Sequence, residues 1–390
     1  MKKAASFALG CKVNQYESEA IAELFAEKGY EIVGIDEEAD VYVINTCTVT
    51  NFGDKKSRQL IRKVKRQNEN AIVAVVGCYA QTAPKELMEI AGVNLVIGTK
   101  DRAQIVEMVE QYDRANGVEN HVSDIMKERV FEPLSIQKLA NRTRAYLKIQ
   151  DGCSQYCSYC IIPYARGPIR SREPQEVVAE VKRLAENGFK EVVLTGIHVA
   201  SYGKDRRDTS LLDILKQVHE VEGIERIRFS SIEPNVVTEE FAQTMAALPK
   251  VCDHFHLSLQ SGCDKTLKEM NRKYDTEKYR QAVATLRKYL PKVALTTDII
   301  VGFPGETEED FRESYAFAEE IGFAKIHVFP YSPKRGTPAA ARKDQLLNAV
   351  KSERSHTLIQ LSDRMAADFL ADAVGTDAEV LYERAVGDGI

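Results

Sequence analysis

Short apolar runs alternate with amphipathic stretches over the first hundred residues. The apolar runs, which are typical of strands buried in a parallel sheet, cover residues 4–9, 41–46, 72–77 and 93–97. Helical patterns lie between them, at residues 17–28, 55–67 and 84–90. This alternation predicts an α/β domain with a doubly wound parallel sheet over residues 1–140.

The alternation resumes with a longer period in the second half of the chain. Strand patterns cover residues 145–150, 190–195, 225–230, 253–259, 293–301 and 324–329. Six strand–helix units predict a partial (β/α)6 barrel over residues 141–372, with its active site at the carboxyl ends of the strands. We expect the domain boundary near Arg142 and a long amphipathic helix over 344–372 at the end of this domain.

The end of the chain has a different pattern. Residues 375–384 start like a strand of a small β domain. A β module needs several strands to be stable. We therefore expect residues 373–390 to be an incomplete β segment, either cut short or disordered.

The composition narrows the class of protein. With 390 residues, 44% of them hydrophobic, the chain can form two or three globular domains. A net charge of −5 excludes a general binder of polyanions, so any nucleic-acid site has to be local. No stretch approaches the ~18 apolar residues of a membrane span, and the N-terminal apolar run is too short for a signal peptide. We expect a cytoplasmic protein whose eight cysteines serve metal binding or catalysis rather than disulfides.

Three cysteines stand at CxxxCxxC spacing directly after the first predicted barrel strand: Cys153, Cys157 and Cys160. A structural zinc site normally takes four protein ligands, whereas a four-iron cube held by three thiolates keeps one iron free to bind another molecule. The spacing therefore favours an open iron–sulfur cluster. A zinc loop completed by a distant residue, or three unrelated buried thiols, remain the alternatives.

Three further cysteines follow predicted strands of the first domain: Cys11, Cys47 and Cys78. In open α/β sheets, ligands bind at the carboxyl ends of the strands, so the fold itself would bring these residues together. Their placement predicts a second cluster with three thiolate ligands. Small buried hydrophobic residues are the alternative, since free cysteine is often used in that way.

Polar residues follow the other predicted barrel strands. The candidates for a cofactor site at this rim are Thr195, Gly196, Ser230, Gln260 and Asp298. A glycine lets the backbone approach a ligand closely, and the polar side chains can bind a ribose or a carboxylate. Taken singly, each residue is equally consistent with a turn or a helix cap.

Basic residues mark two candidate sites for RNA. The helical pattern at residues 55–66 carries seven of them opposite an apolar stripe, a surface that can bind phosphates. Arg166, Arg170 and Arg172 follow the cysteine loop and can meet phosphates there. A solvated helix and surface ion pairs are the respective alternatives.

Six segments together resemble the methylthiotransferases of the radical S-adenosylmethionine (SAM) superfamily. The segments are GCKVNQYESE, NTCTVT, VGCYAQ, DGCSQYCSYCIIPYARG, HLSLQSG and DIIVGFPGET. The sequence around Cys11 and Cys47 is most similar to that of the branch that modifies N6-threonylcarbamoyladenosine at position 37 of tRNA. Members usually end in a small β-barrel domain, TRAM, of which residues 373–390 would be only the opening strand.

This resemblance implies ligands, cofactors and partners. Cys11, Cys47 and Cys78 would hold an auxiliary [4Fe-4S] cluster, and Cys153, Cys157 and Cys160 the cluster that binds SAM. Tyr159 would contact the adenine of SAM, and Thr195-Gly196 its methionine amino group. SAM would be both the methyl donor and the source of the radical that takes the hydrogen from C2 of the adenine in the tRNA. The partners would be the tRNA anticodon loop, an electron donor such as flavodoxin or ferredoxin, and a sulfur source.

Two other functions stay open. A methylthiotransferase can act on another tRNA adenosine or, as in a sister branch, on a ribosomal-protein side chain. A non-catalytic iron–sulfur or zinc-binding module is the alternative of another class.

Overall fold

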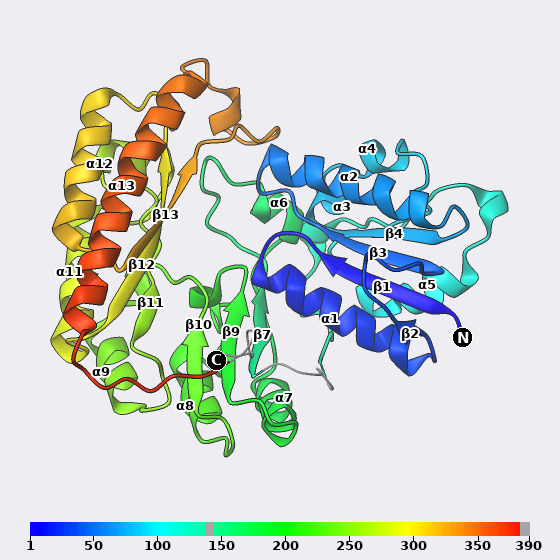
Figure 1. Ribbon diagram of the computed structural model, residues 1–390, viewed down its shortest axis with the longest axis horizontal. Coiled ribbons are helices and arrows are strands. Elements are labelled where there is room, and N and C mark those ends of the chain that lie inside the picture. Colours follow the sequence, from blue (N-terminus) through cyan, green and yellow to red (C-terminus); the bar gives the residue numbers. More distant parts are fainter. Residues whose placement is uncertain (137–142, 383–390) are drawn as a thin grey trace.

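The computed structural model describes residues 1–136 and 143–382, in which two α/β domains lie side by side (Figure 1). The boundary predicted near Arg142 falls outside the described residues. Among those residues, no helix is long and apolar enough to cross a membrane.

The N-terminal domain is built on a six-stranded sheet whose neighbouring strands are all parallel, in the order β2-β1-β3-β4-β5-β6. Its strands are β1 (Lys3–Ala8), β2 (Glu31–Ile32), β3 (Val41–Thr46), β4 (Ile72–Gly77), β5 (Leu95–Val96) and β6 (Glu119–Asn120). Its helices are α1 (Lys12–Glu27), α2 (Asn51–Gln67), α3 (Cys78–Thr82), α4 (Pro84–Met88) and α5 (Ile105–Gln111).

Strands β3 and β4 of this sheet are apolar along most of their length, without alternating polar residues, because helices cover both faces of the sheet. In β3, Tyr42 and Ile44 pack on one side with Ile61 of α2, whereas Val41 and Val43 pack on the other with α1 and α5. The predicted doubly wound parallel sheet is confirmed. The two-residue strands β2 and β6 were not predicted, since so short a stretch leaves no period to recognise.

The second domain is an open barrel of six parallel strands. Its strands are β7 (Arg144–Asp151), β9 (Glu191–Gly196), β10 (Arg226–Phe229), β11 (His254–His256), β12 (Ala294–Val301) and β13 (Lys325–Pro330). They form two sheets, β10-β9-β7 and β11-β12-β13, which parallel bridges such as Ile232 to Leu257 connect. An added short strand, β8 (Arg170–Ser171), pairs antiparallel to β7.

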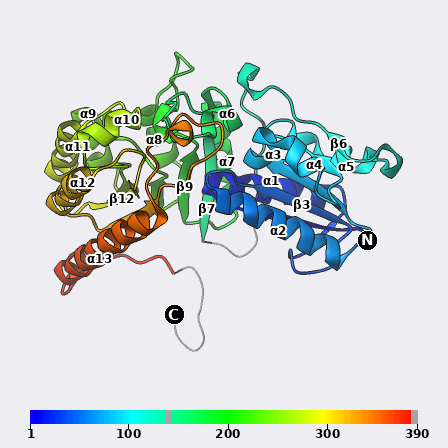
Figure 2. The same cartoon turned by 90° about the horizontal axis from the view of Figure 1, so that it is seen from above.

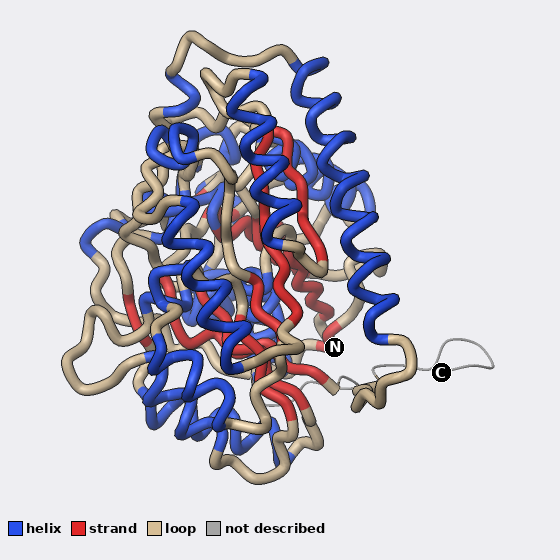
Figure 3. Tube along the Cα trace, turned by 90° about the vertical axis from the view of Figure 1, so that its left-hand side faces the viewer, coloured by secondary structure: helices blue, strands red, loops and turns tan. Residues whose placement is uncertain are grey.

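Helices cover the outer side of the barrel, as the face with α11–α13 shows (Figure 3). They are α6 (Ile162–Arg166), α7 (Pro174–Glu186), α8 (Leu211–His219), α9 (Glu239–Ala247), α10 (Asp264–Glu269), α11 (Thr276–Tyr289), α12 (Glu308–Ile321) and α13 (Asn348–Ala373). The predicted partial barrel and its closing helix are present. The strand expected from residue 375 is wrong for 375–382, which are irregular, and residues 383–390 lie outside the described part.

Helix α1 joins the two domains. It covers one face of the N-terminal sheet, and its Tyr16 and Ala20 belong to the same apolar core as Leu147 of β7 (Figures 1 and 2). The buried hydroxyl of Tyr16 donates to the carbonyl of Leu134 at 2.8 Å. Because α1 begins directly after Cys11, this packing fixes the first cysteine relative to the barrel.

Candidate functional site

Three cysteines of the N-terminal domain lie at the carboxyl edge of its sheet. Strands β1, β3 and β4 are neighbours, and one cysteine follows each of them within three residues. Cys11 is the N-cap of α1, Cys47 precedes α2, and Cys78 opens α3. The fold therefore brings together residues that are 36 and 31 positions apart in the sequence.

The loops of Cys11 and Cys47 are in direct contact. Gly10 has a φ of +98°, and a Cβ atom added to it would lie 2.7 Å from Sγ of Cys47. Only glycine accepts this φ without strain and leaves room for the thiol. The dipeptide Gly10-Cys11 thus allows the thiols of Cys11 and Cys47 to lie close together.

The pKa values of two cysteines of this trio, Cys47 and Cys78, favour the binding of a cation. Burial, followed by repulsion from Cys78 and Cys11, raises the pKa of Cys47 to about 12. Burial also raises the pKa of Cys78, although the nearby Arg166 opposes the rise. Thiolates that repel one another in a buried site are stabilised when a metal centre binds them and releases their protons.

The second trio lies in the loop after β7, at the carboxyl end of the first barrel strand. The backbone N–H of Cys153 donates to the carbonyl of Gly167 at 3.0 Å, and that of Cys160 to the carbonyl of Cys157 at 3.0 Å. Burial raises the pKa of Cys153 to about 11 and that of Cys160 to about 12, and Cys157 adds to both rises. The three thiols of the CxxxCxxC loop therefore converge.

Both donor sets fit an iron–sulfur cube. In the described parts of the chain, no three His, Cys, Asp or Glu side chains are placed to hold a single metal ion. A zinc site gathers its thiolates about 2.3 Å from one centre. A cube binds each thiolate at a different iron, so its ligands stand further apart. An all-cysteine trio is the type of donor set that such a cube takes.

A buried arginine accompanies the CxxxCxxC loop. Nη1 of Arg272 donates to Sγ of Cys157 at 3.1 Å, and Nη2 forms an ion pair with Glu233 at 2.7 Å. Arg272 and Cys157 are 115 residues apart, so the sequence alone gave no sign of this contact. A hydrogen-bonded cation of this kind stabilises a thiolate.

Tyr159 lies in the interior of the same loop. Its ring packs against an apolar cluster that includes Phe303 and Tyr331, and its hydroxyl is 3.5 Å from Nη1 of Arg272. Burial raises the pKa of this phenol well above its usual value, so it stays neutral. The contact of Tyr159 with the adenine of SAM remains a prediction.

The polar rim residues follow neighbouring barrel strands. Ser230 comes after β10, and its buried Oγ has no partner among the described residues. Gln260 has a φ of +71°, and its N–H donates to the carbonyl of Asp298 in β12 at 2.9 Å. A buried hydroxyl without a partner and a strained backbone are both frequent at ligand sites. Their roles toward SAM remain predictions.

Thr195 and Gly196 end β9. Thr195 is buried, and Gly196 packs closely on Gln150, where an added Cβ would lie 2.8 Å from Oε1. Gln150 Oε1 accepts the N–H of His198 at 2.7 Å. The glycine therefore lets β9 approach β7 at the rim.

A histidine and a carboxylate near the rim form a pair that the sequence did not predict. Nε2 of His198 lies 3.0 Å from Glu233, which also accepts a hydrogen bond from Gln155 of the cysteine loop at 3.2 Å. His198 and Arg272 keep the pKa of Glu233 low despite its burial. This carboxylate thus joins the ends of β9 and β10 to the loop that carries Cys153 and Cys157.

The RNA contacts expected of Arg166, Arg170 and Arg172 are wrong. All three side chains are at least 96% buried. Arg166 binds Glu17, Arg170 lies 3.5 Å from Asp151, and Arg172 binds Glu180 at 2.6 Å. Buried charges of this kind are paired with internal carboxylates. These arginines cannot reach phosphates outside the protein.

The basic helix α2 does lie on the surface. A groove of about 600 Å³ beside it is lined by Phe7 and Leu9 from the β1 side and by Lys56, Arg62 and Arg66 from α2. Within the described residues, those three cations form no ion pair. Leu9 precedes Gly10-Cys11, so the groove leads to the cysteine edge of the sheet.

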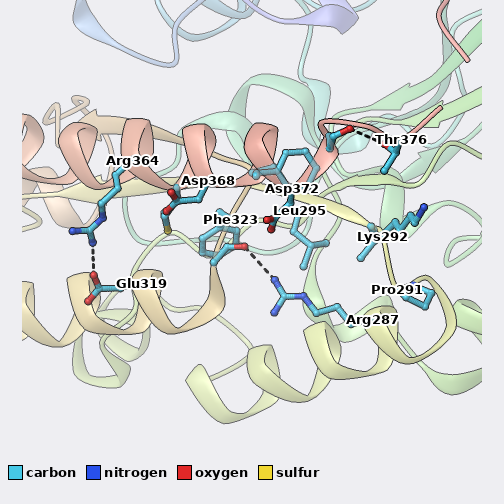
Figure 4. A pocket seen from close by; sticks show the side chains of 16 residues that line it. Arg287, Pro291, Lys292, Leu295, Glu319, Phe323, Arg364, Asp368, Asp372 and Thr376 are labelled. Carbon is cyan, nitrogen blue, oxygen red and sulfur yellow. Dashed lines mark hydrogen bonds and ion pairs between the residues drawn. The ribbon is translucent and has the colours of Figure 1, made fainter. Parts of the chain in front are cut away.

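A larger cavity lies away from the cysteines. It has a volume of about 640 Å³ and is lined by α11, α12 and α13 near the amino ends of β12 and β13 (Figure 4). Arg364 pairs there with Glu319, and Arg287 donates to the carbonyl of Gly322 at 3.1 Å. None of the predicted site residues lines it. It is therefore not the candidate site.

The fold and the cysteine loop define a radical SAM enzyme. Residues 147–318 match the radical SAM superfamily, and residues 3–98 match the uncharacterized protein family UPF0004. The fold is similar to that of the radical SAM methyltransferase TsrM from Kitasatospora setae, with a TM-score of 0.61 and 18% identity over 87% of this chain and 77% of that one.

Relatives narrow the class further. The chain is 49% identical, over 99% of its length and 86% of the relative, to the threonylcarbamoyladenosine tRNA methylthiotransferase MtaB of Bacillus subtilis. It is 39% identical to the MtaB of Aquifex aeolicus, over 97% of this chain and 92% of that protein. It is 38% identical to a tRNA-2-methylthio-N(6)-dimethylallyladenosine synthase of Thermoanaerobacter, over 96% of this chain and 80% of that protein. The chain belongs to the radical SAM methylthiotransferase family.

Family membership confirms the predicted enzyme class and its cofactors, SAM and [4Fe-4S] clusters. The assignment of individual cysteines to the two clusters remains a prediction. The convergence of each trio at the carboxyl ends of parallel strands supports it.

Proposed function

We propose that this enzyme methylthiolates C2 of N6-threonylcarbamoyladenosine at position 37 of the tRNA anticodon loop, with SAM as methyl donor and radical source. One structural observation carries the proposal. Arg166, six residues after Cys160, donates from Nε to Sγ of Cys78 at 3.2 Å. This contact links the N-terminal trio to the helix that follows the CxxxCxxC loop, and it supports the proposal that a sulfur held by one trio reaches a carbon activated at the other.

The cofactors supply the radical and sulfur chemistry that an unreactive aromatic C–H requires and that side-chain acids and bases cannot provide. The chain contributes position and shielding. Cys78 and Cys157 are buried, and each accepts a hydrogen bond from an arginine. Ser230 Oγ has no partner among the described residues and would be free to orient SAM, whereas Oδ2 of Asp298 lies 3.3 Å from Nε2 of His256. We further propose domains at 1–140 and 141–372.

The surface around the junction suits an unpaired RNA loop. Val49 and Phe52 beside Cys47 are 56% and 63% exposed, and Tyr156 and Tyr164 beside the CxxxCxxC loop form an edge-to-face pair with 42% and 46% exposure. Exposed aromatic rings stack on splayed bases, and a target base in a folded loop has to be turned out of its stack. The groove along α2 adds cations for the backbone.

The reaction also needs partners that supply electrons and sulfur. We propose an electron donor such as flavodoxin or ferredoxin, together with a sulfur source. We also propose that the reaction takes place in the cytoplasm, since the proposed substrate is a tRNA.

Nucleoside analysis tests the substrate. The protein is reconstituted anaerobically and supplied with SAM, a reductant and tRNA that carries either threonylcarbamoyladenosine or dimethylallyladenosine at position 37. We expect mass spectrometry to show the methylthio product from the first tRNA only. The matched control is the Cys78→Ala protein, which retains the CxxxCxxC loop and should cleave SAM without forming the product.

Three outcomes would redirect the proposal. If only the dimethylallyladenosine tRNA is converted, this enzyme has the activity for which the 38% identical relative is named. Conversion of neither tRNA, with SAM cleavage intact, would favour a ribosomal-protein side chain. Zinc in place of iron, without SAM cleavage, would leave a non-catalytic module.

A further inference from the structure

One buried side chain contacts both cysteine-bearing regions. Arg166 ends helix α6, which directly follows the CxxxCxxC loop, and its side chain has no exposed surface. Its guanidinium reaches across the domain junction. Nε donates to Sγ of Cys78 at 3.2 Å, and Nη2 donates to Oδ1 of Asn14 at 2.7 Å and to Glu17 at 3.0 Å.

The partners of Arg166 hold further cysteine loops. Asn14 and Glu17 belong to the first turns of α1, which Cys11 caps, and the amide of Asn14 donates to the carbonyl of Thr46 beside Cys47 at 3.1 Å. On the barrel side, Nη1 lies 3.5 Å from Asp151, whose other oxygen accepts the N–H of Gly152 before Cys153 at 2.8 Å. The guanidinium is thus the centre of a network that includes both trios.

We propose that Arg166 is a positioning residue that holds the cysteine-bearing loops of the two domains together and would tune the reduction potential of the auxiliary cluster. A fixed positive charge and an N–H donor at a ligand sulfur stabilise the reduced, more negative state of a cluster, so they raise its reduction potential. A carbon radical has to meet a sulfur at short range, so the same contact aligns the reacting groups. This inference depends on the proposed function only in that the N-terminal trio binds a cluster.

Two other buried arginines provide matched controls. Arg102 shares the partner Glu17 and is equally buried, but it contacts no cysteine. Arg272 contacts Cys157 of the other trio. Lysine keeps the charge at each position but lacks the planar fork, so at position 166 it cannot serve Cys78, Asn14 and Glu17 together.

The test is a potentiometric titration followed by electron paramagnetic resonance. The auxiliary cluster is measured in full chains with C153A/C157A/C160A, and the SAM cluster in chains with C11A/C47A/C78A. We expect Arg166→Lys to lower the reduction potential of the auxiliary cluster by about 59 mV. For one electron, this shift corresponds to a tenfold change in the ratio of reduced to oxidised cluster. Arg102→Lys should leave the reduction potential of the auxiliary cluster unchanged. Arg272→Lys should lower only the potential of the SAM cluster.

Equal shifts in Arg166→Lys and Arg102→Lys, or no shift in either, would overturn the inference and leave Arg166 as an ordinary buried ion pair. Where Arg166→Lys fails to fold, 15N-arginine in the C153A/C157A/C160A chain decides. A nitrogen coupled to the cluster in electron–nuclear double resonance supports the contact, and its absence overturns it. If that chain takes up no iron at all, the proposed function fails as well, which separates the two results.

Discussion

At the scale of single residues, Gly152 fixes where the CxxxCxxC loop leaves β7. It has a φ of +73°, and an added Cβ would lie 1.9 Å from the carbonyl oxygen of Pro168, which is part of the backbone. The left-handed conformation alone costs a larger residue about 1–2 kcal/mol. Here the clash adds to that strain and displaces the segment between Arg166 and Arg170.

We expect Gly152→Ala to lower the free energy of unfolding by more than about 3 kcal/mol, which is the upper end of the strain usually found at a single residue. We also expect it to prevent assembly of the SAM cluster. Denaturant unfolding and iron content measure both effects. The control is Gly188→Ala, which has a similar φ of +87° but no atom within 4 Å of the added Cβ. It should cost about 1–2 kcal/mol and leave the iron content unchanged. Equal behaviour of the two variants would contradict the role of the clash.

Single residues also show where sequence reasoning stopped. The six cysteines could be found because a short spacing marks one trio and strand ends mark the other. Arg166 and Arg272 could not, because their partners are 88 and 115 residues away and only the tertiary fold brings them together. Arginines after a cysteine loop gave no indication of burial, so three internally paired residues were predicted to bind RNA.

At the scale of elements, α2 is the surface best placed to hold the RNA backbone. Thr50 caps its start by accepting the N–H of Gly53 at 3.2 Å. Buried Ile61 and Val64 fix one face on the sheet, so the basic face has to point outward. The sequence predicted the helix and its basic face, and only the structure showed the groove beside it, which is lined in part by Leu9, two residues before Cys11.

We expect K56Q/R62Q/R66Q to weaken binding of a tRNA anticodon stem-loop and to reduce the slope of log affinity against log salt by about 2, since each phosphate contact contributes roughly 0.7–0.9. Fluorescence anisotropy at several salt concentrations measures the slope. The control, K182Q/K216Q/K278Q, removes three exposed lysines from α7, α8 and α11. An equal loss of slope in both proteins would assign the effect to net charge alone.

At the scale of the whole molecule, the segment after β13 ties the barrel to the N-terminal domain. Residues 331–345 leave the barrel, and the N–H of Ala339 donates to the carbonyl of Ser158 in the CxxxCxxC loop at 2.9 Å. Earlier in the same segment, Lys334 pairs with Asp54 in a buried contact, and Asp54 accepts the hydroxyl of Thr48 beside Cys47 at 3.0 Å. The segment therefore contacts both cysteine regions.

This arrangement was beyond sequence reasoning for a physical reason. Strand and helix periods predict elements and their order, and the family resemblance predicts the cofactors. A loop without a period carries no signal of what it touches, and the pairing of Lys334 with Asp54 spans 280 residues. The domain order could be predicted, but the contacts that hold the two domains together could not.

The pairing of Lys334 gives a test of how the domains are held. Lys334→Met removes the cation and leaves the carboxylate of Asp54 buried without its partner, which costs about 3–5 kcal/mol for a buried pair. We expect a lower unfolding midpoint and faster alkylation of Cys47 in the metal-free protein, because the loop that carries it loses its anchor. The neighbouring Arg335→Met is the control, since Arg335 is 95% exposed and its contact with Glu86 is worth less than about 1 kcal/mol. The double variant K334M/D54N should regain part of the loss, because it removes the unpaired charge. If Cys47 is alkylated at the same rate in Lys334→Met and Arg335→Met, the segment does not anchor the auxiliary site.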